Sequence, residues 1–360
     1  MFSAPVSSPE EKRRLEAERM DIIEVNHART WNRFVTGNAH ACYTHLYEWR
    51  ELIENVYGHK SLYLSAVKEN KICGLLPLYC IKRPLSTPYW VSMPFFDHAG
   101  VLGEADAGKQ LIKKAESLLC SHKGGNLSLR QNNRFNPGDL PLGRGRPDVF
   151  NEKVSLQIPL ASSPQLMMAG FRSKLRNQIN KGVKNGLTWE IGKKRLLDSF
   201  YHVFSRNMRD LGSPVHSKAF FRAVFNFFPD NAFICVVYYK RTPVAASFMF
   251  RFKKALANPW ASSLRAYRHL NSNMLLYWQM IRFACTLGLD FFDMGRSSKG
   301  ASTYRFKQQW SPRETPLNWF TWEWGDKRVP RETLVIQPWK KMPVRIANIA
   351  GPMIRKYISL

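Results

Sequence analysis

One segment of the chain, residues 292–312, gathers acidic, basic, hydroxyl and aromatic side chains: FDMGRSSKGASTYRFKQQWSP. It follows an apolar stretch that predicts a strand, whose alternation puts Asp293 on the face opposite Phe292 and Met294. Asp293 is therefore expected at the carboxyl end of a strand, where loops build sites in α/β sheets. Two roles are open for it: a general base, or a structural carboxylate that pairs with Arg296 or caps the loop.

The sequence lacks the common motifs that bind nucleotide phosphates, coordinate metals or present a hydrolase nucleophile. It contains no GxxxxGK[ST] and no GxGxxG, and GRSSKG at 295–300 is one residue too long for a GxSxG elbow. Without an HExxH motif or a close Cys/His cluster, we expect no metal site and no tightly bound cofactor. The 6 cysteines form no CxxC pair, which predicts buried thiols rather than disulfides.

Helix and strand signals alternate along the 360 residues, which predicts an α/β class with two domains. A stretch rich in Pro, Gly and Asn at 132–148 separates the halves. We therefore expect a polar N-terminal extension at 1–20, a first domain at 21–150, a second at 151–325 that carries the site, and a basic amphipathic tail at 326–360. The aromatic stripes between 196 and 228 have helical spacing and are interpreted as core.

Positive charge dominates the chain, with 54 Lys+Arg against 27 Asp+Glu and a net charge of +27. Such a field attracts RNA, anionic lipid or an anionic thioester carrier, although a solvated basic surface is the alternative. A helix predicted from Pro164 to Lys184 suits RNA phosphates or an anionic headgroup. Its basic residues are Arg172, Lys174, Arg176, Lys181 and Lys184.

The tail beyond Lys340 has apolar residues at helical spacing with basic residues nearby. It is expected either to lie on an anionic inner-membrane surface or to pack against the second domain, and Gly351-Pro352 predicts a kink. The N-terminus lacks the apolar region of a secretory signal, and no apolar run is long enough to span a bilayer. We expect a cytoplasmic protein with peripheral contact at the inner membrane.

The segment DFFDMGRSSKGASTYRFKQQW resembles the FemAB-like family that accompanies the exosortase/PEP-CTERM envelope system. The family pattern is a strand ending in FDFGRS, a turn with glycine, and an aromatic-Phe-Lys-x-x-Trp segment. Similar blocks are RSKLRNQINKGVKNGL (172–187), MRDLGSPVHSKAFF (208–221), MLLYWQMIRFA (274–284) and WKKMPVRIANIAGP (339–352). With LPLY (76–79) and VSMPFFDHAG (91–100), the resemblance covers nearly the whole chain.

The resemblance implies two tandem GNAT-like domains with a basic C-terminal helix and a BioF2-like acetyltransferase domain. It implies an acyltransferase that forms an amide on an amine of an exopolysaccharide or peptidoglycan-type envelope precursor. In that family the Phe-Lys pair lies beside the acyl carbonyl and its lysine stabilises the oxyanion, which here means Phe306 and Lys307. Trp260 and Gln279 depart from the family pattern, which leaves the proton acceptor open.

The expected site divides into three groups of residues. The catalytic group is Lys307, Asp293 and Tyr304, the last as a second hydrogen-bond donor. The substrate-binding group is Phe306, Arg296, Ser297, Trp310 and Trp260. The group that binds an anionic donor is Arg172, Lys174, Arg176, Lys181, Arg265 and Arg268.

The residues expected to bind the donor depart from the usual GNAT sequence. GNAT enzymes hold the coenzyme A pyrophosphate on a Q/RxxGxG/A loop, but the equivalent residues here, RAYRHLNSN (265–273), include no glycine. Arg265 and Arg268 are left to hold phosphate with their side chains. Aminoacyl-tRNA is the leading hypothesis, an acyl thioester of coenzyme A or acyl-carrier protein the second. A non-catalytic basic adaptor that binds RNA or membrane is the third.

Overall fold

The computed structural model describes residues 20–83, 87–121, 125–132, 145–323 and 336–359. The predicted extension at 1–20 lies outside them except for Met20, as do most of the stretch at 132–148 and residues 326–335 of the predicted tail. The strands are β1 (Asp21–Glu24), β2 (Lys60–Lys68), β3 (Lys71–Ile81), β4 (Tyr89–Val91), β5 (Leu102–Gly103), β6 (Asn126–Asn132), β7 (Asp148–Pro159), β8 (Leu187–Gly192), β9 (Ala232–Tyr239), β10 (Thr242–Phe252), β11 (Ala255–Ser263), β12 (Phe291–Ser298) and β13 (Arg313–Trp322). The helices are α2 (Ala28–Gly37), η1 (Tyr43–His45), α3 (Glu48–Tyr57), α4 (Ala105–Ser121), α5 (Pro164–Gly170), α6 (Ser173–Lys184), η2 (Lys194–Leu196), α7 (Leu197–Leu211), α8 (Lys218–Phe227), η3 (Arg265–Leu270), α9 (Ser272–Thr286), α10 (Ser302–Gln308), α11 (Ile336–Lys340) and α12 (Val344–Arg355).

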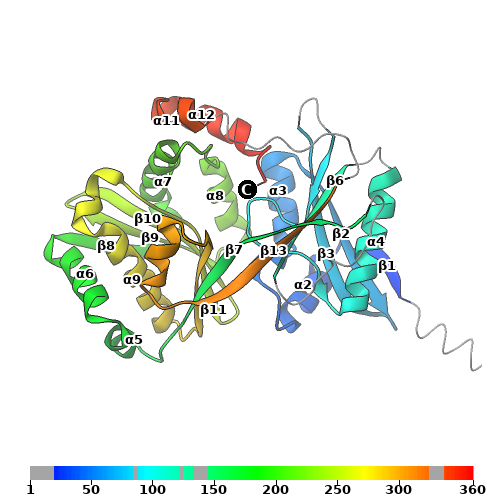
Figure 1. The fold of residues 1–360 in the computed structure, drawn as a ribbon, viewed down its shortest axis with the longest axis horizontal. Helices are drawn as coiled ribbons and strands as arrows, with labels where there is room; N and C mark the ends of the chain where they lie inside the picture. The colour runs from blue at the N-terminus through cyan, green and yellow to red at the C-terminus, as the bar shows by residue number, and fades with distance from the viewer. Residues whose placement is uncertain (1–19, 84–86, 122–124, 133–144, 324–335, 360) are drawn as a thin grey trace, which may run out of the picture.

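The described strands confirm the α/β class and form one 13-stranded sheet in the order β1-β2-β3-β4-β6-β13-β7-β12-β11-β10-β9-β8, with β5 paired to β3. Strands β7 and β13 cross the middle of the molecule between its two halves (Figure 1). β13 pairs antiparallel with β6 of the first half and with β7 of the second. The expected boundary at residue 150 falls inside β7, at the seam of this sheet.

The two halves also share a hydrophobic core. The Trp49 ring lies 4.8 Å from the Phe96 ring of its own half and 4.7 Å from the Phe228 ring of the other. The aromatic stripes of α7 and α8 pack into this core, which confirms their interpretation as core residues. Because apolar contact joins the halves, residues from both can be held in fixed positions at their junction.

The single helix predicted from Pro164 to Lys184 is wrong, because Phe171 and Arg172 adopt extended backbone between α5 and α6. The Phe171 side chain is buried against the rings of Trp278 and Trp310, 6.0 and 5.5 Å away. Arg176 Nη1 donates to Ala169 O (3.1 Å) and Phe171 O (2.7 Å), so that it covers the end of α5. Burial of one aromatic ring therefore outweighs local helix continuity.

The tail packs on the second half and ends at the first. Helix α12 runs through Pro352 and contacts α7, and a Cβ on Gly351 would lie 2.9 Å from Val215 Cγ1. Beyond the helix, the carbonyl of Ser359 accepts from Phe95 N (2.5 Å) and Arg130 Nη1 (3.2 Å). The C-terminal segment thus joins both halves (Figure 1). None of the helices in the described residues has the length and apolar character needed to cross a bilayer.

Candidate active site

The site lies where two parallel strands part. β11 and β12 pair only from Ala255–Phe291 to Ala257–Asp293, after which they share no further pairs. β12 is irregular between Asp293 and Arg296, around Gly295 at φ +70°, and then pairs with β7 again. Backbone groups beyond Asp293 are therefore released from the β11–β12 ladder, and those of Gly295 and Arg296 bond to side chains instead.

Asp293 is buried at this point, with 8% exposure. Its Oδ1 accepts from Gly295 N (2.8 Å) and Ser155 Oγ (3.4 Å), and its Oδ2 accepts from Gln157 Nε2 (3.4 Å). Burial raises the pKa of the Asp293 carboxyl, against the opposing effect of His98 and the Gly295 amide. The loop-capping role is thus present. The proposed Asp293–Arg296 pair is wrong, because the Arg296 side chain pairs with Asp97.

Lys307 reaches the same turn from α10 and is also 8% exposed. Its Nζ donates to Gly295 O (3.1 Å) and Arg296 O (2.8 Å), which leaves one ammonium proton for another acceptor. Burial lowers the pKa of Lys307 to about 8, although Asp97 and Asp293 favour its charge. The ammonium therefore holds the turn in place and lies beside the position where the strands part.

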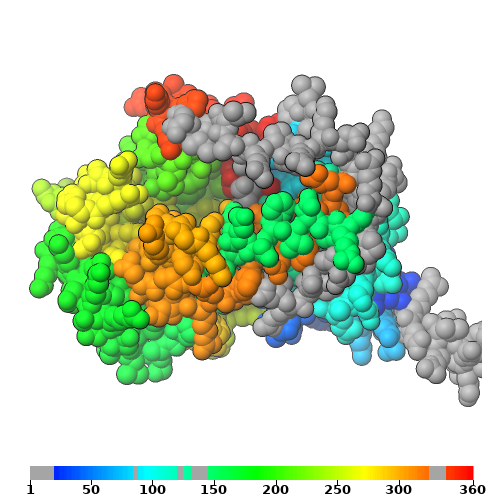
Figure 2. Space-filling model, in the orientation of Figure 1, coloured from blue at the N-terminus to red at the C-terminus, as the bar shows by residue number. Residues whose placement is uncertain are grey.

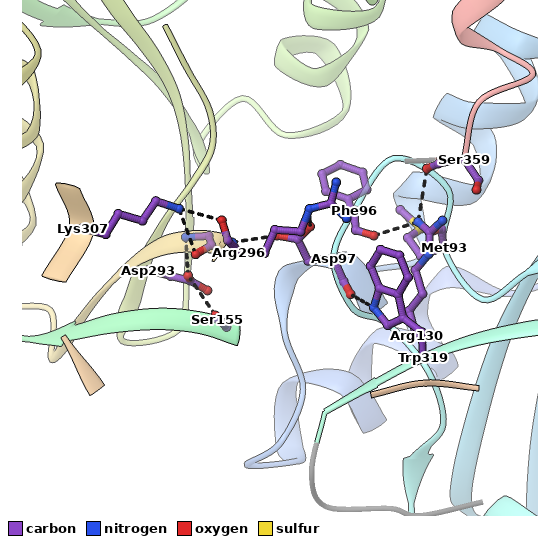
Figure 3. Close-up of polar contacts among 11 residues, drawn as sticks. Met93, Phe96, Asp97, Arg130, Ser155, Asp293, Arg296, Lys307, Trp319 and Ser359 are labelled. Atoms are coloured by element: carbon purple, nitrogen blue, oxygen red, sulfur yellow. Dashed lines mark hydrogen bonds and ion pairs between the residues drawn. The ribbon is translucent and has the colours of Figure 1, made fainter. Parts of the chain in front are cut away.

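The first half contributes Asp97 to this centre. Its Oδ1 lies 3.1 Å from Arg296 Nε and its Oδ2 accepts from Arg296 N (3.2 Å). Its backbone carbonyl accepts from Trp319 Nε1 (3.0 Å). Figure 3 shows the resulting row of polar contacts from Lys307 through Arg296 and Asp97 to Trp319.

Three cations surround the Trp319 ring: Arg296 from the second half, Arg130 from the first, and Lys153 from β7. Their charged groups lie 5.3, 4.9 and 5.2 Å from the ring centroid. Burial lowers the pKa of Arg130 to about 10 and also lowers the pKa of Lys153. Asp97 is the carboxylate bonded to this group, and its single negative charge does not balance three cations. The junction therefore favours negative charge in a bound molecule.

The remaining predicted catalytic and substrate residues make other contacts. The Tyr304 hydroxyl donates to Glu314 of β13, and Phe306 packs 5.0 Å from the Tyr277 ring. Ser297 is buried, and its Oγ has no hydrogen-bond partner among the described residues. Trp310 is 1% exposed in the core of the second half, and Trp260 lies in the shared core, so both rings offer a substrate little surface.

The predicted donor-binding residues come from neighbouring elements. Lys174 and Lys181 line an open hollow of about 410 Å³ on α6. The Arg176 guanidinium instead donates to backbone carbonyls at the end of α5. Helix α6 packs on the start of α9, where Asn185 Nδ2 donates to Leu270 O (3.3 Å). Arg265 and Arg268 are exposed on η3, which precedes α9, and Arg172 is exposed before α6. In Figure 2, α6 (green) and the segment before α9 (yellow) share one face.

No sequence motif indicated five of the groups that complete the centre: Ser155, Gln157, Arg130, Lys153 and Trp319. The sixth, Asp97, lies in the block VSMPFFDHAG, which carried no assigned role for it. Within the described residues, no three His, Cys, Asp or Glu side chains are grouped so that they could hold a metal ion.

Sequence comparison matches residues 169–308 to the family described as Acetyltransferase (GNAT) domain. The search of curated proteins found no significant match. Among solved structures, the crystal structure of FemX is similar at TM-score 0.64 and 11% identity, over 83% of this chain and 96% of that one.

Two other solved structures share the fold. The structure of L-PGS from Bacillus licheniformis has TM-score 0.54 and 11% identity, over 94% of this chain and 98% of that one. A tandem GNAT protein from the clavulanic acid biosynthesis pathway has TM-score 0.54 and 10% identity, over 86% of this chain and 100% of that one. The chain therefore has a tandem GNAT-like α/β fold, and its residues 169–308 match the acetyltransferase (GNAT) domain family.

Proposed function

We propose that this protein is an N-acyltransferase that forms an amide on an amine of a cell-envelope precursor, with an aminoacyl-tRNA as donor. The observation that carries the proposal is a buried ammonium, Lys307, beside the buried carboxyl of Asp293 at the parting of β11 and β12. The GNAT domain match over 169–308 includes both residues and supports acyl transfer. The exosortase/PEP-CTERM association and the envelope acceptor rest on the family resemblance.

The arrangement suits attack of an amine on an activated ester. The carbonyl carbon of the donor becomes tetrahedral, and its oxygen takes negative charge that the third N–H of Lys307 stabilises. Asp293 accepts the proton of the amine, a role that its raised pKa favours over an ordinary carboxylate. Arg296, fixed by Asp97, orients the reacting groups at the junction of the halves.

The donor assignment rests on the basic surface of α6 and η3, which lies on the same half as Lys307. Four exposed cations, Lys174, Lys181, Arg265 and Arg268, come from two elements joined through α9. Such a surface can follow a phosphate backbone, whereas a loop without glycine gives fewer amides for one pyrophosphate. An acyl thioester of coenzyme A or acyl-carrier protein is the competing donor.

The double variant Lys174→Glu/Lys181→Glu is expected to weaken binding of charged tRNA by about tenfold or more at low salt, because two attractive contacts become repulsive. The measurement is native mass spectrometry with charged tRNA, uncharged tRNA and a coenzyme A thioester at two salt concentrations. Lys193→Glu/Lys194→Glu, at the start of η2, is the matched control. Selective retention of the thioester would overturn the tRNA assignment, and equal binding of both RNAs would favour the adaptor.

The exposed face of α12 suits contact with an anionic membrane that presents a lipid-linked acceptor. Ile346, Ile349 and Met353 are 52%, 72% and 66% exposed along one stripe, while Ala347 and Gly351 face the protein. Lys340, Lys341 and Arg345 lie beside the stripe. Apolar insertion and cation attraction then act on the same surface.

Ile349→Glu is expected to reduce binding to vesicles of phosphatidylglycerol and phosphatidylcholine by about tenfold, because it puts a charge into the inserting stripe. Flotation of the protein with vesicles measures the effect. Val183→Glu, at an apolar residue 48% exposed on α6, is the control and should float as the parent does. Unchanged flotation of Ile349→Glu would exclude α12 as the contact surface.

A further inference from the structure

A cavity of about 550 Å³ lies in the first half, between the sheet and the C-terminal part of α4. Its walls come from β1, β2, β4 and α4, together with the end of β3. In the sheet order, β6, β13 and β7 separate these strands from β12, and α4 lies at the opposite end of the molecule from α6 (Figure 1). None of the groups around this cavity takes part in the transfer chemistry proposed above.

The walls of the cavity are apolar because the side chains of its strands alternate between two faces. Leu62 and Leu64 of β2 face the apolar cluster beneath α4, whereas Tyr63 between them packs in the core shared by the two halves. Leu62, Trp90 and Leu118 pack against the cluster beneath α4 but are only partly buried. An alkyl chain in the cavity would remove the exposed parts of these three side chains from water, which favours its binding.

Positive charge surrounds the same cavity. Lys60 at the start of β2, Lys82 after β3 and Lys114 on α4 all line it and are exposed. The lining also includes the carboxylate of Glu24, but Glu24 Oε1 lies 3.0 Å from Arg50 Nη2 and is paired there. Within the described residues, no carboxylate forms an ion pair with any of the three lysines. The charge at this cavity therefore complements an anion.

We propose that this cavity binds a single alkyl chain with an anionic head, a carboxylate or a phosphate monoester, taken up from solution as a monomer. The chain lies against Leu62, Trp90 and Leu118, and the head lies among the lysines. Because those lysines are exposed, the head keeps contact with water and no charge is buried without a partner. The volume is within the range of small-molecule sites. Binding here does not depend on acyl transfer, so the site can be tested separately from the proposed function.

The first test is isothermal titration calorimetry of the full chain with octanoate, decanoate and dodecanoate, each kept below its micelle concentration. Affinity is expected to rise about threefold to fourfold for each added methylene, because each one leaves water for the apolar walls. Dodecyl phosphate and dodecanoate are compared to identify the preferred head. Equal affinities for octanoate and dodecanoate would overturn the proposal, as would binding of dodecyltrimethylammonium as tight as that of dodecanoate.

Reversal of charge tests the role of the lysines. Lys60→Glu/Lys114→Glu is expected to weaken binding of dodecanoate about tenfold or more, because two attractive charges become repulsive. Lys68→Glu/Lys71→Glu is the matched control, since these exposed lysines lie at the other ends of β2 and β3, outside the cavity. Unchanged affinity in the first variant would exclude recognition of the anionic head.

A larger side chain tests the apolar part of the site. Leu118→Trp is expected to fill part of the cavity and weaken binding of dodecanoate about tenfold, whereas Leu166→Trp, at a residue 60% exposed on α5, should bind as the parent does. Thermal unfolding shows whether each variant is folded. Both variants should float with phosphatidylglycerol vesicles as the parent does. Reduced flotation of folded Leu118→Trp alone would identify a membrane lipid as the source of the chain and overturn uptake from solution.

Photocrosslinking of the unmodified protein locates the chain without any substitution. A dodecanoate analogue with a diazirine at the far end of its chain is irradiated with the protein, and the labelled peptides are mapped by mass spectrometry. Labels are expected on β2 and on the C-terminal part of α4, and an excess of dodecanoate should remove them. Labels confined to the exposed apolar stripe of α12 would overturn the proposal.

Discussion

Lys307→Met is expected to lower kcat for amide formation by about 100-fold to 1,000-fold, with little change in KM for the donor. Lys307 has one proton free beyond its two bonds to the carbonyls of Gly295 and Arg296. An ammonium fixed in this way needs no reorganisation when charge develops on the carbonyl oxygen, so its removal affects the transition state more than the ground state.

The measurement is steady-state amide formation together with thermal unfolding, because the same ammonium also holds the turn at Gly295. Lys299→Met removes a neighbouring charge whose side chain is 66% exposed and is the matched control. Lys307→Arg keeps the charge and should recover part of kcat if charge is what matters. Normal turnover by a folded Lys307→Met protein would exclude the catalytic role and favour the adaptor.

The same residue gives the activity of the parent a defined pH dependence. The stabilising form of Lys307 is the protonated one, and burial places its pKa at about 8. Protonation is complete well below that value and is lost as pH rises through it, so kcat should fall on the alkaline side of pH 8. Lys307→Arg should remove this alkaline fall, because a guanidinium stays protonated there.

Arg130→Met is expected to lower the free energy of unfolding by about 3 kcal/mol or more, the largest stability effect we expect from a single polar side chain. Arg130 is 1% exposed, and its Nη1 donates to the carbonyls of Met93 (2.7 Å), Phe96 (2.8 Å) and Ser359 (3.2 Å). Its removal leaves those carbonyls without their shared donor and takes one cation from the face of Trp319.

Guanidinium chloride unfolding at fixed pH measures this effect, with Arg305→Met on the exposed surface of α10 as control. Arg130→Lys should recover only part of the loss, since an ammonium lacks the planar shape that reaches the carbonyls and stacks on the indole. A change below about 1 kcal/mol for Arg130→Met would show that water replaces the guanidinium at little cost.

The sequence was most informative where structure follows from local patterns. The expectation that Asp293 ends its strand was wrong, because β12 continues to Ser298 and only its pairing with β11 ends at Asp293. Alternation nevertheless predicted the strand itself, and helical spacing identified α7 and α8 as core helices. Both patterns reflect which face of an element is buried, and residues close together in the sequence determine that face.

Features set by distant contacts were not predicted. The break at Phe171 depends on Trp278 and Trp310, and the ion pair of Arg296 depends on a loop of the other half. The near-complete burial of Lys307 also contradicts the usual exposure of lysine, so no local pattern indicates it.

The position of β13 has a consequence during translation. β6 pairs with β13, and about half of the chain separates the two strands in sequence. Until the ribosome has added β13, the edge of β6 that will pair with β13 has unpaired backbone N–H and C=O groups. Such edges pair readily with other chains. We infer that nascent chains of this protein need a chaperone, or slow early folding of the first half, until β13 has emerged.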